Sequence, residues 1–187
     1  MASLPRLNIP LHVKYIQDLG QNKDDLTYHL TAHLRVNAIY WGLTALCVMK
    51  RKDALDREEM IEFVMSCWDE EAGDKYGEID TRFSYCAINA LSLLDRLREL
   101  DIDKTAGYIL RCRNFDGGFG AVIGAESHAA QVCVCTASLA ILDRLHEVDQ
   151  DTLAWWLAER QLPNGGFNGR PEKLEDVSQL FIIKSIA

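Results

Sequence analysis

The sequence lacks the features that would place it in several large classes of protein. It has only 4 Pro in 187 residues and no alternating apolar and polar segment, so nothing predicts a β-rich fold. The longest apolar stretch, 132–142, contains Cys, Thr and Ser and is about half of the roughly 20 residues that a membrane span needs. With a net charge of −8 and no basic run longer than Lys50-Arg51-Lys52, binding to nucleic acid or to an anionic membrane is not expected.

The cysteines also lack the spacing of a metal or redox motif. None of the six forms a Cys-x-x-Cys pair, and each lies among apolar residues, so we expect all of them to be packing residues in a reducing compartment. The segment MASLPRLNIP has neither the apolar run nor the cleavage site of a secretory signal, and no lipidation cysteine stands at 184–187. We therefore expect a cytoplasmic protein without a membrane span.

The sequence does contain an internal repeat. Apolar residues make up 48% of the chain and charged residues 26%, which is enough for a packed core. Three matches share one offset of 48 residues, and such self-similarity indicates a repeat architecture. The matching pairs are Asp95-Arg96-Leu97 with Asp143-Arg144-Leu145, Asp116-Gly117-Gly118-Phe119 with Asn164-Gly165-Gly166-Phe167, and Glu78 with Glu126.

Each repeat is predicted to form a pair of helices closed by a glycine turn. Apolar spacing predicts long helices over 80–100 and 127–146, each followed by a shorter one, over 104–112 with Asp103 as N-cap and over 150–161. An earlier, looser copy has helices over 35–49 and 57–68, the second capped by Asp56. The expected fold is all-α, either an open solenoid or a closed α/α barrel, in one domain, 1–187, with units at about 25–73, 78–120 and 126–169.

The first unit is interrupted. The segment 67–73 begins like 112–118, but it lacks the Gly-Gly-Phe turn and soon reaches Gly77-Glu78-Ile79-Asp80. We expect that about one repeat is missing there, and that the loss leaves apolar inner helices without cover.

Several motifs resemble those of the protein prenyltransferase β subunits, in particular the type II (Rab) geranylgeranyltransferases. The resemblance covers about 22–177. It is carried by Tyr40-Trp41-Gly42-Leu43-Thr44, Gly77-Glu78-Ile79-Asp80-Thr81-Arg82-Phe83-Ser84, Asn114-Phe115-Asp116-Gly117-Gly118-Phe119-Gly120, Glu126-Ser127-His128-Ala129, the run 155–163 (WWLAERQLP) and the run 168–177 (NGRPEKLEDV).

The resemblance implies the transfer of a prenyl group and an α/α barrel of about six helix pairs, which is incomplete in this chain. The chain would pair with an α subunit and transfer geranylgeranyl from geranylgeranyl diphosphate to C-terminal cysteines of Rab GTPases presented by an escort protein. Zinc would lower the pKa of the acceptor thiol, and cations would stabilise the charge that develops on the diphosphate. The implied residues are His128, Arg170, Lys173 and Arg82 for the diphosphate, Tyr40, Trp41 and Phe83 for the lipid wall, and Asp176 for zinc.

The same residues have plainer interpretations when each is taken alone. His128 begins a predicted helix and is typical of a capping or surface residue. Arg170 and Lys173 lie beside Glu172 and Glu175, as in a solvated ion-pair surface. Tyr40 and Trp41 are equally typical of core residues. The glycine turns are equally typical of turns that bind no ligand.

The sequence departs from the family pattern at the zinc site. Ser178 stands where the pattern has Cys, Gln179 replaces a tyrosine, and the position of a distant His is not reached, so one of three protein ligands is present. We expect impaired transfer, with a non-catalytic form that binds the α subunit or prenyl lipid as the alternative. The turn at 161–167 also suggests a triterpene-cyclase-like enzyme. Such an enzyme needs an Asp-x-Asp-Asp acid motif, and the segment 101–104 has Lys104 where that motif has its last Asp.

Overall fold

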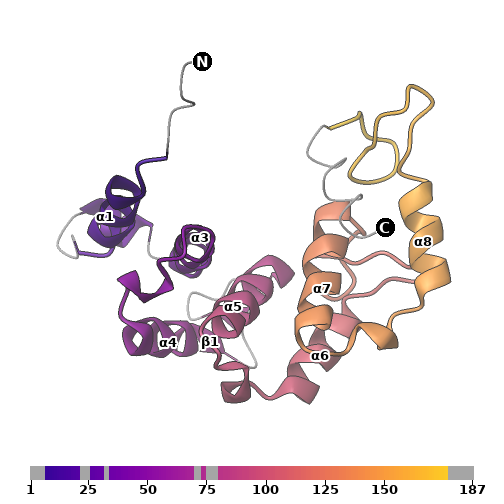
Figure 1. Ribbon diagram of the computed structural model, residues 1–187. Helices are drawn as coiled ribbons and strands as arrows, with labels where there is room; N and C mark the ends of the chain where they lie inside the picture. The colour runs from indigo at the N-terminus through magenta and orange to yellow at the C-terminus, as the bar shows by residue number, and fades with distance from the viewer. Residues whose placement is uncertain (1–6, 22–25, 32–33, 70–72, 75–79, 177–187) are drawn as a thin grey trace.

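The protein is a curved stack of helix pairs. A computed structural model describes residues 7–21, 26–31, 34–69, 73–74 and 80–176. Figure 1 shows the pairs following an arc, with α3, α5 and α7 side by side and α4, α6 and α8 on the outer side. The helices are α1 (Ile9–Leu19), α2 (Leu26–Leu30), α3 (Arg35–Val48), α4 (Arg57–Ser66), α5 (Thr81–Leu93), α6 (Ile102–Arg111), α7 (Ala129–Ile141) and α8 (Gln150–Ala158).

The remaining regular elements are short. A 3-10 turn joins the two helices of each pair: η2 (Lys52–Ala54), η3 (Leu97–Glu99) and η4 (Leu145–Glu147). The strands β1 (Trp68–Asp69) and β2 (Gly73–Asp74) have two residues each and pair antiparallel. The predicted all-α class is therefore confirmed. In the part of the chain that the structure describes, no helix is both long and apolar enough to cross a membrane.

The inner helices are shorter than predicted. The helix expected over 80–100 ends at Leu93, and the one expected over 127–146 ends at Ile141. Asp95 and Asp143 have positive φ angles of 56° and 59°, and a residue in the left-handed region ends an α-helix. The apolar residues beyond this point keep a helical spacing because they belong to the 3-10 turn, which is why the sequence pattern extended the helices too far.

An aspartate begins each outer helix. The carboxylates of Asp56 and Asp101 accept the backbone N–H three residues later, at 2.9 and 3.0 Å, and Asp149 does the same at 3.3 Å. The predicted cap at Asp56 is confirmed. The predicted cap at Asp103 is wrong, because α6 begins at Ile102 and Asp103 lies in its first turn.

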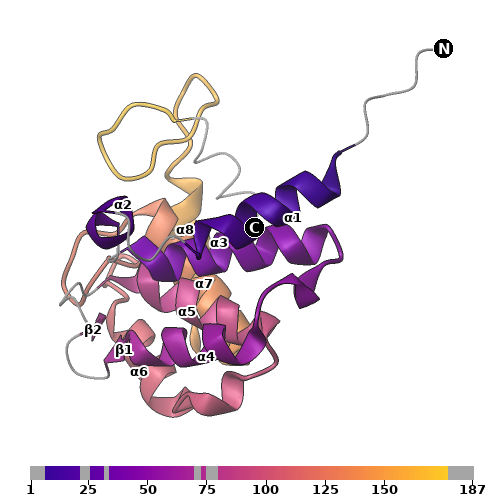
Figure 2. The ribbon, with the colours of Figure 1, turned by 90° about the vertical axis from the view of Figure 1, so that its left-hand side faces the viewer.

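The core is continuous where a repeat was expected to be missing. Leu43 and Leu46 of α3 and Ile88 and Leu91 of α5 are completely buried, because α3 packs directly against α5. The expected loss of cover therefore does not occur at this junction. Exposed apolar residues gather instead on α1, α2 and α3, which Figure 2 shows from their outer side.

The cysteines contribute to this core. Cys67, Cys86, Cys112 and Cys135 are buried and free, and Cys47 and Cys133 are half-buried. Burial raises the pKa of the Cys86 thiol to about 12. These placements fit the predicted packing role.

The repeat provides a matched pair of glycines for a stability test. Gly117 and Gly165 have φ angles of 89° and 84°, but a Cβ on Gly117 would lie 2.8 Å from the Thr152 carbonyl carbon, whereas nothing lies within 4 Å of one on Gly165. We expect Gly165→Ala to lower the free energy of unfolding by about 1–2 kcal/mol, the strain of a left-handed alanine. Gly117→Ala should lower it further, because the turn must also move away from α8. Urea unfolding measures both, and equal losses would contradict the close approach.

Candidate functional site

The inner helices begin at one end of the stack. Asp80 is the N-cap of α5 and His128 is the N-cap of α7, and Asp176 stands a further 48 residues along the chain. The loop after each outer helix returns to this end, where the Ala121 and Gly169 carbonyls accept the N–H groups of Thr81 and Ala129 at 2.9 and 2.8 Å. The repeat thus gathers residues from distant parts of the sequence.

His128 caps the inner helix α7. Its Nδ1 accepts the N–H of Ala130 at 3.1 Å, so the predicted capping role is confirmed. Because Nδ1 accepts, the neutral ring carries its proton on Nε2 and can donate one hydrogen bond from that atom. Burial lowers the pKa of His128, and so does the cation of Arg170, against weaker opposing effects of Glu126 and Asp176. His128 is therefore a neutral donor at pH 7.

The two arginines of the site are each held by a carboxylate. Arg82 bonds Asp80 through Nε and Nη2, at 3.1 and 2.7 Å from Oδ2, and Nη1 of Arg170 bonds Oε2 of Glu126. The side chains of Arg82 and Arg170 are 61% and 40% exposed. Both arginines lower the pKa of His128, so each lies within electrostatic reach of the imidazole. The plainer interpretation had expected Arg170 to pair with its sequence neighbours Glu172 and Glu175. It pairs with Glu126 instead.

Lys173 is not joined to this group. Its side chain is exposed, and its backbone carbonyl accepts the Asn168 side-chain amide at 3.2 Å. Among the described residues no ion pair involves its ammonium group, so the expected contact with Glu172 or Glu175 is not formed.

The predicted lipid residues lie on α3 and α5. The hydroxyls of Tyr40 and Tyr85 are 3.4 Å apart, and Asn89 donates to Tyr85 at 3.1 Å. Trp41 is 66% exposed, so a core role is wrong for it, while Phe83 is half-buried. Sequence reasoning missed Tyr85 and Asn89, because only the direct packing of α3 on α5 brings them to Tyr40.

The residues present do not fit a zinc site. Asp176 is exposed, and its backbone N–H bonds the Phe167 carbonyl at 3.0 Å. Within the described ranges, no three His, Cys, Asp or Glu side chains are placed to hold a metal ion. Ser178 and Gln179 lie outside the described residues, and 177–187 contain no Cys, His, Asp or Glu. A single carboxylate is too few donors for a catalytic zinc.

The partly buried position of His128 gives a pH dependence of stability. Its pKa in the folded chain lies below the ordinary 6.5, so the unfolded chain takes up a proton first as the pH falls. The contribution of His128 to the free energy of unfolding should therefore be fully present above pH 6.5. It should decrease as the pH falls from 6.5 toward the folded-state pKa. In His128→Asn, which keeps a capping side chain, this part of the decrease should be absent. Urea unfolding at several pH values measures it, and identical profiles would contradict the assignment.

Comparisons with known proteins agree with this architecture. The family described as "Prenyltransferase alpha-alpha toroid domain" matches residues 7–76 and 74–181. The two matches meet where the sequence predicts a missing repeat. The chain is 38% identical to "Geranylgeranyl transferase type-2 subunit beta" of Saccharomyces cerevisiae, over 94% of this chain and 72% of that protein. That alignment runs over 235 positions, more than the 187 residues here, so the relative has positions that this chain lacks.

Two further comparisons support the assignment. The Candida albicans protein of the same name is 36% identical over 89% of this chain and 68% of its own length. A solved structure, "Candida albicans protein geranylgeranyltransferase-I complexed with GGPP", has a TM-score of 0.64 and 26% identity and covers 81% of this chain. This chain spans about half (53%) of that structure. The predicted resemblance is thus confirmed, and the chain belongs to the prenyltransferase alpha-alpha toroid family, among whose members the β subunits of type-2 geranylgeranyl transferase are its relatives.

Proposed function

We propose that this chain is a β subunit of a geranylgeranyl transferase whose diphosphate-binding residues are kept and whose transfer of the prenyl group is impaired. The observation that carries the proposal is the grouping of His128, Arg170 and Arg82 where the inner helices begin. Two guanidinium groups and an imidazole N–H suit an anion with many oxygens. The names of the relatives support geranylgeranyl diphosphate as its source.

Each residue of the group has a distinct part in binding. Arg170 and Arg82 would donate to diphosphate oxygens while Glu126 and Asp80 hold their positions. His128 would donate from Nε2. As the carbon–oxygen bond to the lipid breaks, charge grows on the diphosphate, and fixed donors stabilise that charge more than they stabilise the substrate. The lipid would lie along α3 and α5, beside Tyr40, Trp41 and Phe83, with Lys173 as a further, more distant cation.

Activation of the acceptor thiol is the part that the chain does not support. The family resemblance assigns this step to zinc, which would lower the pKa of the thiol. The donors around Asp176 do not fit the metal, so we derive no step through it. This disagreement favours a chain that binds prenyl diphosphate more readily than it transfers the prenyl group.

The partners in this proposal follow from the family. The relatives are named as β subunits, and we propose a separate α subunit as the other one. The acceptor would be a Rab GTPase presented by its escort protein in the cytoplasm. The second candidate function is a non-catalytic form that binds the α subunit or prenyl lipid without transfer, and the replacement at Ser178 favours it.

Binding of geranylgeranyl diphosphate tests the proposed group. Arg170→Ala should weaken binding about tenfold, since a hydrogen bond to a charged group contributes about 1.5–3 kcal/mol. Arg98→Ala removes an exposed arginine of η3, distant in sequence from Arg170, and should leave the affinity for geranylgeranyl diphosphate unchanged. Titration calorimetry measures both. Equal affinities for the two variants would count against the group, and no binding by the unmutated chain would refute the proposed function.

Zinc analysis tests the impaired transfer. The purified chain should hold far less than one zinc per molecule, and a chelator should leave geranylgeranyl diphosphate binding unchanged. Ser178→Cys adds a thiolate donor two residues after Asp176 and should raise zinc affinity, while Ser178→Ala should not. Stoichiometric, tightly held zinc in the unmutated chain would overturn this part of the proposal.

A further inference from the structure

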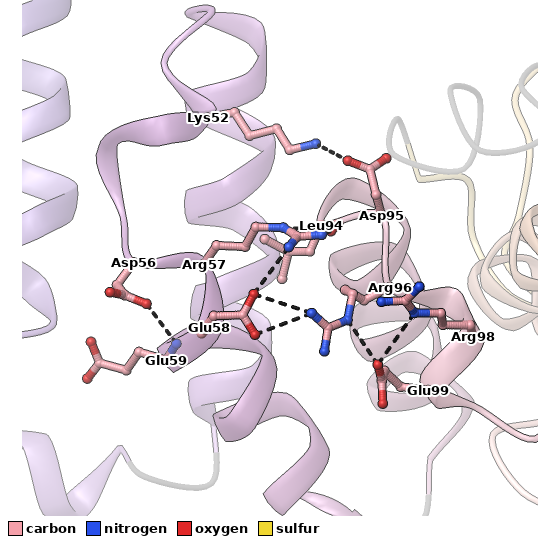
Figure 3. A network of polar contacts seen from close by, with 10 residues as sticks. All are labelled: Lys52, Asp56, Arg57, Glu58, Glu59, Leu94, Asp95, Arg96, Arg98 and Glu99. Atoms are coloured by element: carbon pink, nitrogen blue, oxygen red, sulfur yellow. Dashed lines mark hydrogen bonds and ion pairs between the residues drawn. The ribbon is translucent and has the colours of Figure 1, made fainter.

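An arginine joins neighbouring units on the outer side of the stack. Arg96, which precedes η3, reaches back to Glu58, the second residue of α4, with Nη1 3.3 Å from both carboxylate oxygens. Its Nε bonds Glu99 of its own turn at 2.9 Å. Figure 3 shows this arginine between the two carboxylates. The contact ties the second unit to the first.

The same joint recurs 48 residues later. Arg144 bonds Asp103, the second residue of α6, and its Nη1 lies 2.6 Å from Oε1 of Glu147. The structure therefore contains two examples of one docking contact, an arginine after an inner helix and a carboxylate in the first turn of the preceding outer helix.

Arg51 occupies the same position in the first unit without these partners. Its backbone N–H bonds Leu46 at 2.8 Å, just as that of Arg96 bonds Leu91. Ala54 stands where the later turns have glutamate. Among the described residues, the guanidinium of Arg51 forms an ion pair only with Asp53, at 3.8 Å. Its side chain is 46% exposed, against 19% for Arg96.

Apolar residues of α3 next to Arg51 are uncovered in the same way. Trp41 and Val48 are 66% and 79% exposed. Their counterparts 45 residues later are Cys86, which is 6% exposed, and Leu93, which is half-buried against the core. α1 lies against this side of the first unit, where Gln17 donates to the Ala54 carbonyl at 2.6 Å, but the part that carries Trp41 and Val48, with Arg51 at its edge, stays uncovered.

The complementary carboxylate stands at the other end of the stack. Asp151 is the second residue of α8, the position held by Glu58 in α4 and Asp103 in α6. It is exposed, and the described part of the chain gives it no ion pair. One turn further, Trp155 is 70% exposed on the same face.

We propose that two copies of this chain dock head to tail, with Arg51 of one copy on Asp151 of the other. The contact repeats a joint that the fold already makes twice, and it would cover Val48 and Trp155. Such an interface is heterologous and closes only if the rotation of the units brings the second pair of faces together. The arc of units in Figure 1 is open on one side, and the proposed dimer requires that two such arcs joined at both faces close into a ring.

Light scattering of the full chain tests the docking. The unmutated protein should approach twice its 21.1 kDa as its concentration is raised. Arg51→Glu and Asp151→Arg each place like charges at the joint and should leave a monomer. The double variant Arg51→Glu, Asp151→Arg restores opposite charges and should restore the dimer. Arg98→Glu, an equal charge change at a side chain that is 78% exposed, should leave the dimer intact.

Each outcome bears on the proposal. A monomer at every concentration, or a dimer that survives both single charge reversals, overturns it. A double variant that stays monomeric while its circular dichroism matches that of the unmutated chain also counts against it. Because geranylgeranyl diphosphate binding is measured separately, failure here leaves the proposed function standing.

Discussion

The packing of α3, α5 and α7 against one another is the constraint on which the rest of the structure depends. Small and branched residues such as Ala90, Leu91 and Val132 are completely buried between these helices, so their spacing is set by close packing. Because successive helices repeat the same contact, their N-termini meet at one end of the stack and their C-termini at the other. One packing rule thus places the candidate diphosphate residues at one end and the joints between units at the other.

The packing also explains how the shortened stack holds together. The segment 70–79 connects units that the sequence suggests were not neighbours in a longer relative, yet α3 and α5 bury Leu43, Leu46 and Ile88 between them. Arg96 and Glu58 form the same joint across this junction as Arg144 and Asp103 form across the next. Repeat proteins tolerate the loss of a unit because each unit contacts only its neighbours.

The sequence was informative about what repeats and less so about what does not. The offset of 48 residues predicted the helix pairs and the equivalent turns, because helix spacing and turn glycines are local properties. It misplaced the helix ends, since the left-handed Asp95 and Asp143 look like ordinary helix residues. It could not show that Arg170 pairs with Glu126, or that Tyr85 meets Tyr40, because such contacts depend on how the units stack.

In the proposed site, His128 would link ligand binding to local stability. Its Nδ1 holds the first turn of α7 while its Nε2 keeps a proton to donate, so one ring can serve as cap and as donor. An anion that accepts from Nε2 fixes the tautomer that caps the helix. Occupancy would then reach beyond the site itself, as slower exchange of the amide hydrogens at the start of α7.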